Sequence, residues 1–152
     1  MKKNNDIEQI LLNDSAFEQA VKTLKRNGYK ATGKRQRILE VLYKNDKYMT
    51  AKEVQDRLKK MFPGISPDTI YRNLHTFVEL SVVEQTELNG EKLFRSNCET
   101  HGHHHHFICT ECGNSEELDM CPLEQFQEQL PGCEVTAHRF ELFGRCQNCF
   151  AS

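Results

Sequence analysis

The segment from His101 to Cys112 most constrains how this 152-residue chain folds. It reads His-Gly-His-His-His-His-Phe-Ile-Cys-Thr-Glu-Cys, and a second Cys-x-x-Cys pair follows at Cys146 and Cys149. All seven cysteines fall in the last 55 residues, and five of the seven histidines fall within six positions. Thiolate and imidazole are the ligands that zinc and similar borderline-soft divalent metals prefer. The sequence therefore predicts that the C-terminal part folds around metal ions.

The two Cys-x-x-Cys pairs predict one structural zinc site. Each pair forms a zinc knuckle, a tight turn that directs two thiolates at one ion, and two such turns complete a tetrahedron. The 33 residues between Cys112 and Cys146 exceed the usual zinc-ribbon gap, but a strand–helix–strand segment fills such a length. The alternative is a pair of redox-active disulfides. Zinc is favoured because thioredoxin-type sites lie beside a βαβ pattern, which this sequence lacks.

The histidine run predicts a strand that serves two further metal sites. Side chains alternate along a strand, so His103 and His105 face one side while His104 and His106 face the other. One strand then supplies a pair of imidazoles to each of two ions. An affinity tag is the alternative, but tags occur at termini, and this run leads directly into the Cys109 pair.

Charge divides the chain into two unlike halves. Residues 1–85 carry 16 Lys and Arg against 11 Asp and Glu, whereas residues 86–152 carry 4 against 11. The basic half points to a nucleic acid partner, which the acidic half would repel. An apolar leader and a membrane-length apolar run are both lacking, so a cytoplasmic protein without a membrane partner is expected. Cysteines in that compartment are expected to bind metals or act as sensors rather than form disulfides.

The N-terminal half has the pattern of helices followed by a hairpin. A capping box at Thr50 and Glu53 opens one helix, and Ser66-Pro67 opens another with an N-cap and proline at the first position. Asn89-Gly90 is the preferred two-residue hairpin turn. This order is typical of a winged helix-turn-helix, and a small helical domain with an added hairpin is the alternative. The predicted helices begin at Ser15, after Thr32-Gly33, at Thr50 and at Ser66, and the hairpin strands are 82–88 and 92–94.

Beyond Cys98 the pattern predicts a small α/β domain. Strands are expected over 103–109, 115–118 and 134–143, with a helix over 122–130. The fold class is therefore α+β.

Several of these motifs together resemble the Fur superfamily of metal-dependent transcriptional repressors. They are the string Asp68-Thr-Ile-Tyr-Arg-Asn-Leu, the hairpin, the His-rich strand and the two Cys-x-x-Cys pairs, and they extend from about Lys22 to Cys149. The segment 86–95 with Cys98 is most similar to zinc uptake regulators of Gram-positive bacteria. The resemblance implies a winged-helix DNA-binding domain over 1–98, with 1–14 as a candidate flexible segment, a hinge over 99–102, and a metal-binding dimerisation domain over 103–152 with a four-cysteine zinc site.

The resemblance also implies one structural zinc and one or two regulatory zinc ions per protomer. No metal role is expected for Cys121 or Cys133. The structural site takes Cys109, Cys112, Cys146 and Cys149; the sensing site takes Glu84, Cys98, His104 and His106; the second regulatory site takes His103, His105, Glu124 and His138.

Cys98 is the residue that indicates which metal is sensed. A thiolate ligand favours zinc over Fe²⁺ because zinc is the softer and more tightly bound ion. Iron and peroxide sensors of this superfamily use nitrogen and oxygen ligands, one of them a histidine from the DNA-binding domain. This chain has no histidine before Arg72, and Tyr48 occupies about that position. The alternatives are a buried apolar role for Cys98 and a solvated wing position for Glu84.

The helix 66–80 is the candidate recognition helix. The resemblance implies that Tyr71 lies against thymine methyl groups and that Arg72 reaches purine acceptors. It makes Lys30 the residue that enters an A·T-rich minor groove. A solvated surface charge is the alternative for each basic residue. The remaining predicted contacts, to phosphates, are those of Lys34, Arg35 and Arg37.

The function predicted from these features is a zinc-responsive repressor of zinc uptake genes. It would bind an A·T-rich palindrome in double-stranded DNA as a metal-loaded homodimer, without a small-molecule substrate. An iron- or peroxide-sensing repressor of the same superfamily is the alternative. A zinc hydrolase is disfavoured, because the chain has no His-Glu-x-x-His motif and every expected site is filled by protein ligands.

Overall fold

The computed structural model describes residues 2–45, 47–97 and 104–151, with side chains from residue 14 onward. The chain divides into a first unit, Met1–Thr100, and a second unit, His101–Ser152. The predicted hinge over 99–102 therefore lies outside the described residues. Among the helices of the described residues, none is both long and apolar enough to cross a membrane.

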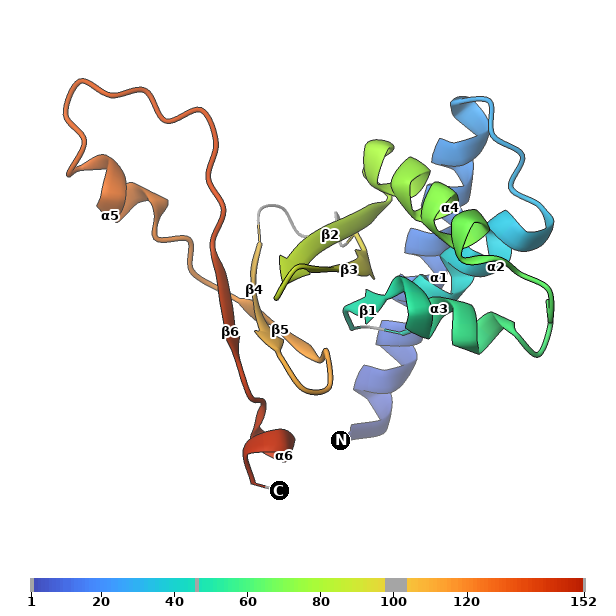
Figure 1. Cartoon of the computed structure of the whole chain (residues 1–152). Helices are drawn as coiled ribbons and strands as arrows, with labels where there is room; N and C mark the ends of the chain where they lie inside the picture. Colours follow the sequence, from blue (N-terminus) through green and yellow to red (C-terminus); the bar gives the residue numbers. More distant parts are fainter. Residues whose placement is uncertain (1, 46, 98–103, 152) are drawn as a thin grey trace. The chain divides into compact units, whose positions relative to one another are not determined.

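The first unit contains four helices and a three-stranded antiparallel sheet in the order β1-β3-β2 (Figure 1). This arrangement confirms the predicted α+β class and its helical N-terminal domain. The two-residue strand β1 was not predicted, because so short a strand has no sequence period. The elements are α1 (Lys2–Arg26), α2 (Gly33–Lys44), β1 (Met49–Thr50), α3 (Ala51–Leu58), α4 (Pro67–Glu79), β2 (Val83–Leu88) and β3 (Glu91–Ser96).

Two of these helices begin where the capping residues predict. In α3 the Glu53 backbone N–H donates to the Thr50 hydroxyl at 3.1 Å, and the Thr50 N–H donates to the Glu53 carboxylate at 2.8 Å. In α4 the Thr69 N–H donates to the Ser66 hydroxyl at 3.2 Å, and Pro67 occupies the first turn. Each cap satisfies backbone donors that have no partner within the helix. The caps therefore set where α3 and α4 start.

The hairpin between β2 and β3 turns at Asn89-Gly90, as predicted. Both residues have positive φ angles, 53° and 79°, which a type I′ turn requires. Leu88 pairs with Glu91 across the turn, and Val83 pairs with Ser96 at the far end. The hairpin is therefore in register over the full length of both strands.

Packing in the core of the first unit determines which face of α4 is exposed. Ile70, Leu74 and Phe77 recur at helical spacing along α4, and all three are fully buried. Tyr71 lies on the other face and is 51% exposed. Burial of the apolar face accordingly presents the neighbouring polar residues to solvent. The other fully buried core side chains are Leu24, Ile38, Leu39, Leu42, Met49 and Val54.

The second unit is a small sheet with a thin core. Strand β4 lies between β5, which runs antiparallel to it, and β6, which runs parallel (Figure 1). Ile108 and Cys109 are the buried apolar residues among the described part of this unit. Large apolar side chains remain exposed on it, namely Met120, Phe126, Leu130, Leu142, Phe143 and Phe150. The elements are β4 (His105–Cys109), β5 (Ser115–Leu118), α5 (Leu123–Gln127), β6 (Glu141–Gly144) and α6 (Gln147–Phe150).

Several boundaries differ from those predicted. Helix α1 begins at Lys2 rather than Ser15, because Ile7, Ile10 and Leu11 continue the helical apolar spacing upstream. The predicted strand 134–143 is shorter, since β6 pairs with β4 only from Glu141, opposite His106. One residue before β6, the Phe140 carbonyl oxygen instead lies 3.1 Å from the side-chain Nδ1 of His105. The helix predicted over 122–130 is also shorter, and α6 was not predicted.

Loss of the α3 capping box should weaken the first unit. We expect Thr50→Ala to lower the free energy of unfolding by about 1 kcal/mol, because the Glu53 backbone N–H loses the Thr50 hydroxyl that accepts its hydrogen bond. Lys52→Ala, an exposed change on the same helix, should alter it by less than about 0.5 kcal/mol. Chemical denaturation followed by circular dichroism measures both. Equal stabilities of the two variants would contradict the role of the cap.

Candidate functional site

The four cysteines of the two Cys-x-x-Cys pairs gather at one end of the second unit's sheet. Cys109 ends β4, and Cys146 caps the short helix α6 that follows β6. The sulfurs of Cys112 and Cys146 are 3.6 Å apart, and all four sulfurs lie within 4.8 Å of one another. Sulfurs around a tetrahedral zinc are separated by about 3.8 Å, given Zn–S bonds of about 2.3 Å. The cluster therefore has the dimensions of a zinc site with four thiolate ligands.

The surroundings of Cys109 favour its thiolate form, which is the form that binds a metal. Burial opposes ionisation of the sulfur, but backbone N–H groups of Cys112 and Cys146 direct their dipoles at it and lower the pKa of Cys109 to about 6. The Cys146 N–H donates to this sulfur at 3.3 Å. Hydrogen bonding to Cys146 instead raises the pKa of Cys149. A bound divalent cation would stabilise the deprotonated form of all four cysteines, because cysteine binds metals as thiolate.

A second cluster lies beside β4 and combines imidazole with sulfur. His105 Nε2 lies 3.3 Å from the Cys121 sulfur, and the same sulfur lies 3.4 Å from His138 Nε2. His105 is 5% exposed, whereas the other two residues are half-buried. Of the predicted second regulatory set, His105 and His138 are thus brought together. Glu124 is exposed on α5 and does not belong to this group, and His103 lies outside the described residues.

The sequence predicted no metal role for Cys121. The residue sits between β5 and α5, and nothing in its spacing relates it to the histidine run. Only pairing of β4 with β5 and β6 brings its segment beside His105 and His138. The one feature of the sequence that could have indicated a metal role for Cys121 is its position in the half of the chain that is rich in metal ligands.

The predicted sensing residues are distributed over both units. Glu84 lies on β2, where its carboxylate is 3.5 Å from the Tyr48 hydroxyl. His104 precedes β4, and its Nδ1 lies 2.7 Å from the Glu117 carboxylate. A carboxylate on Nδ1 leaves Nε2 as the ligand nitrogen of the neutral ring. His106 is buried on β4, and Cys98 lies outside the described residues. This four-residue set remains a prediction.

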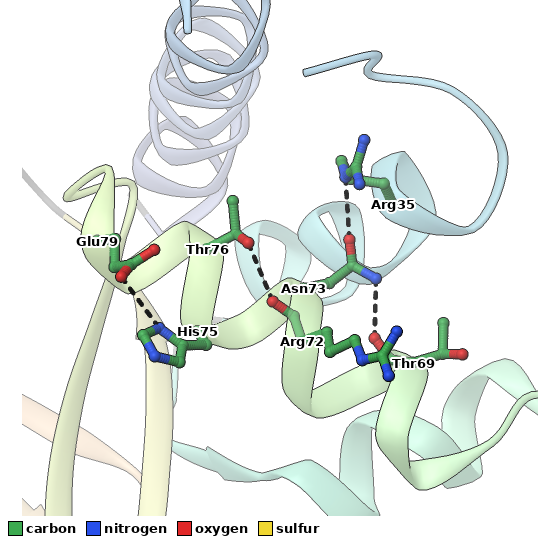
Figure 2. A pocket seen from close by; sticks show the side chains of 7 residues that line it. All are labelled: Arg35, Thr69, Arg72, Asn73, His75, Thr76 and Glu79. Atoms are coloured by element: carbon green, nitrogen blue, oxygen red, sulfur yellow. Dashed lines mark hydrogen bonds and ion pairs between the residues drawn. The ribbon is translucent and has the colours of Figure 1, made fainter. Parts of the chain in front are cut away.

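The exposed face of α4 carries the predicted base-contacting residues. Tyr71 is 51% exposed, and the Arg72 side chain is 80% exposed with an ion pair to Asp68 at 2.9 Å. A shallow hollow runs along this face, and Figure 2 shows the side chains that line it. They are Arg35, Thr69, Arg72, Asn73, His75, Thr76 and Glu79.

Arg35, near the start of α2, connects α4 to α2 and to the segment before α2. Its Nε donates to the Asn73 side-chain oxygen at 3.0 Å, and one terminal nitrogen donates to the Lys30 carbonyl at 3.1 Å (Figure 2 shows the first). The guanidinium also lies over the Tyr29 ring, 5.3 Å from its centre. Arg35 thus positions α4 and the Lys30 segment in addition to any phosphate contact. The other predicted phosphate residues, Lys34 and Arg37, lie on the same helix as Arg35, α2.

Comparison with known proteins identifies the family. The sequence matches the ferric uptake regulator family, FUR, over residues 26–143. The chain belongs to this family. A curated relative, the ferric uptake regulation protein of Staphylococcus epidermidis, is 48% identical over 130 residues, which span 86% of this chain and 93% of the relative.

Solved Fur-family structures share the fold. The Helicobacter pylori ferric uptake regulator superposes with a TM-score of 0.69 at 22% identity, covering 92% of this chain and 95% of that one. A zinc uptake regulator complexed with zinc and DNA superposes with a TM-score of 0.68 at 23% identity, covering 91% and 95%. The expected Fur-like α+β fold is thereby confirmed.

Membership in the Fur family defines the broad activity. Fur-family proteins are metal-responsive transcription regulators, and this chain is one of them. The family consists of regulators rather than enzymes, in agreement with the expectation of no catalytic activity. The family does not by itself decide between zinc and iron as the metal.

Removal of one knuckle thiolate should unfold the second unit alone. Structural zinc contributes on the order of 10 kcal/mol to folding in zinc-binding peptides, far more than the thin apolar core of this unit supplies. We expect Cys146→Ser to lose the tightly held zinc and hydrogen-exchange protection over 104–151, while residues 14–97 stay protected. Cys133→Ser, an exposed cysteine outside both clusters, is the matched control. Full protection of 104–151 in zinc-free Cys146→Ser would contradict this role.

Proposed function

We propose that this Fur-family chain is a zinc-responsive repressor. In this proposal the zinc-loaded homodimer binds an A·T-rich palindrome through α4 and represses genes for zinc uptake. The zinc-bound, DNA-bound state of a solved neighbour supports the proposal at the level of the fold.

The choice of zinc over iron rests on which metal-ligand side chains the first unit contains. His75 is the one histidine in the sequence of residues 1–97, and it lies on the exposed face of α4, paired with Glu79 at 3.7 Å. Close to Glu84 the structure places the hydroxyl of the buried Tyr48. An iron sensor of this family would need an imidazole there. Cys98, which follows the wing in sequence, would instead supply a thiolate, and thiolates favour zinc.

A metal that joins the two units would act by selecting one arrangement of them. Glu84 and Cys98 belong to the first unit, and His104 and His106 belong to the second. A ligand shifts a conformational equilibrium only by as much as it binds one state better than the other. A site assembled from both units meets this condition, because its four donors come together only in one arrangement. Metal loading would then set the spacing of the two recognition helices.

The dimer is supported by the surface of the second unit. Its described residues bury little apolar surface internally and leave exposed phenylalanines, including Phe126, Phe143 and Phe150. Apolar side chains left exposed on a domain with so small a core are expected to be covered by a partner surface. A two-fold dimer also matches the symmetry of a palindromic site.

Iron is the second candidate metal. The S. epidermidis relative, 48% identical over 86% of this chain, is named a ferric uptake regulation protein. Such identity makes an iron-responsive function a specific alternative. The metal that activates DNA binding at the lower free concentration decides between the two.

Zinc-dependent DNA binding should require Cys98. On protein that retains its knuckle zinc, we expect Zn²⁺ to activate operator binding at a lower free concentration than Fe²⁺, measured anaerobically by fluorescence anisotropy in metal buffers. Cys98→Ser should abolish the zinc response while size-exclusion chromatography shows an intact dimer. Cys133→Ser should respond like the unchanged protein. Activation at lower free Fe²⁺ would support the iron-responsive alternative, and a monomeric Cys98→Ser would make that residue structural.

Arg72 and Lys34 should affect DNA binding in different ways. Arg72→Ala should weaken operator binding by about 1–3 kcal/mol and relax discrimination between bases, because its guanidinium reads a base edge. Lys34→Ala should weaken operator and unrelated DNA alike and reduce the salt dependence by about one phosphate contact. Anisotropy titrations at several salt concentrations measure both. Equal losses on operator and unrelated DNA for Arg72→Ala would contradict base reading.

A further inference from the structure

We propose that Cys121 is a metal ligand, and that His105, Cys121 and His138 together form a sulfur-containing zinc site in the second unit. The predicted set for this region contained only imidazole and carboxylate. The inference deepens the proposed function by changing the donor chemistry of its second regulatory site. It rests on the proposed function only for that regulatory consequence, since metal binding itself requires no DNA.

The distances fit a shared ion. The Cys121 sulfur lies 3.3 Å from His105 Nε2 and 3.4 Å from His138 Nε2. With Zn–N bonds of about 2.05 Å and Zn–S bonds of about 2.3 Å, tetrahedral geometry separates nitrogen and sulfur by about 3.6 Å. All three ligand atoms lie within 4.8 Å of one another. An outward adjustment of a few tenths of an ångström would admit the ion.

The hydrogen bonding of His105 presents the correct nitrogen. Its Nδ1 lies 3.1 Å from the Phe140 carbonyl oxygen, which only accepts, so Nδ1 carries the proton and donates. In the neutral ring the lone pair then resides on Nε2, the atom that faces the Cys121 sulfur. Histidine ligands of metals commonly donate their other N–H to a carbonyl in this way. The ring is further held edge-on against Phe140, with centres 5.6 Å apart.

The three residues come from three separate segments that the sheet brings together. His105 begins β4, Cys121 lies between β5 and α5, and His138 lies in the irregular segment before β6. The rings of His105 and His138 have centres 5.2 Å apart and are tilted by 56°. Two imidazoles that converge on one sulfur from different segments form a chelating arrangement rather than a stacked pair. Three protein ligands suffice for zinc, whose fourth position takes water or another donor.

Hydrogen bonding alone is the competing explanation. A single thiol proton can be donated to His105 Nε2, and His138 Nε2–H can in turn donate to the sulfur. Such a chain would hold the three side chains without metal. The two explanations differ in an observable way, because only a metal ligand gains a sulfur–metal bond and is shielded from alkylation when metal is added.

The thiolate changes which ions the site accepts. Replacement of a carboxylate by a thiolate shifts preference toward zinc and Co²⁺ and away from Mn²⁺ and Fe²⁺. Glu124, which the family resemblance assigned to this site, is exposed on α5 and lies outside the cluster. Under this proposal, sulfur ligation at Cys121 selects against hard ions independently of Cys98.

Cobalt binding to the full-length protein tests the proposal. Protein with zinc retained in the knuckles and carrying Cys98→Ser is titrated with Co²⁺, and thiolate-to-cobalt charge-transfer absorption is recorded. We expect a band that saturates at about one equivalent per protomer. Addition of Cys121→Ser should remove this band and weaken zinc binding at the site at least about 100-fold in chelator competition. Cys133→Ser and Glu124→Gln, added separately to the same background, should leave the band in place.

Alkylation gives a second readout on the unmutated protein. Mass mapping after iodoacetamide treatment should show Cys121 protected by added zinc, while the exposed Cys133 reacts equally with and without it. Unchanged absorption in the Cys121→Ser variant, or its absence from the Cys98→Ser background itself, would overturn the proposal, as would equal alkylation of Cys121 with and without zinc. Zinc content and circular dichroism verify that each variant retains its knuckles and fold. Because no DNA is present, these outcomes are separate from failure of the zinc-responsive repressor function.

Discussion

Four cysteine sulfurs lie within 4.8 Å of one another where β4 and β6 end, and we expect the second unit to depend on a metal ion bound by them. The apolar core of its described residues is too small to fold a domain of this size alone, since Ile108 and Cys109 are its buried apolar residues. A metal ion bound by the four thiolates would supply what the core lacks. Because β4 ends at Cys109, the same constraint positions the histidines at the start of that strand.

The first unit is stabilised in a different way. Its helices bury leucine, isoleucine and phenylalanine side chains in an extended core, and capping residues satisfy the exposed backbone groups where α3 and α4 begin. Arg35 then links α2 to α4 through a hydrogen bond to Asn73. Helix α4 is thus held by packing and hydrogen bonds within its own unit. Under the proposed mechanism, metal needs only to change the relative placement of units that are each already formed.

Under these proposals, the cysteine ligands decide which metal the chain prefers. Hard ligand sets of imidazole and carboxylate accept iron, manganese and zinc, whereas a thiolate shifts the preference toward zinc. Cys98 and Cys121 are each proposed to contribute one such thiolate, at the sensing site and at the second site. The high identity to a protein named for ferric uptake makes this chemistry the decisive point. Family membership establishes regulation by metal, and individual ligands determine the metal.

Local sequence signals determined much of this protein. The capping box at Thr50, the proline start of α4, the Asn89-Gly90 turn and the two Cys-x-x-Cys pairs each act over a few residues, so their outcome is readable from the chain. Element ends were less predictable, because a strand ends where its pairing with a neighbour stops, and β6 pairs with β4 only from Glu141 onward. The composition of the second cluster was decided by tertiary structure alone. Cys121 lies 16 residues from His105 and 17 from His138, and only the pairing of β4 with both its neighbours places these three side chains around one point.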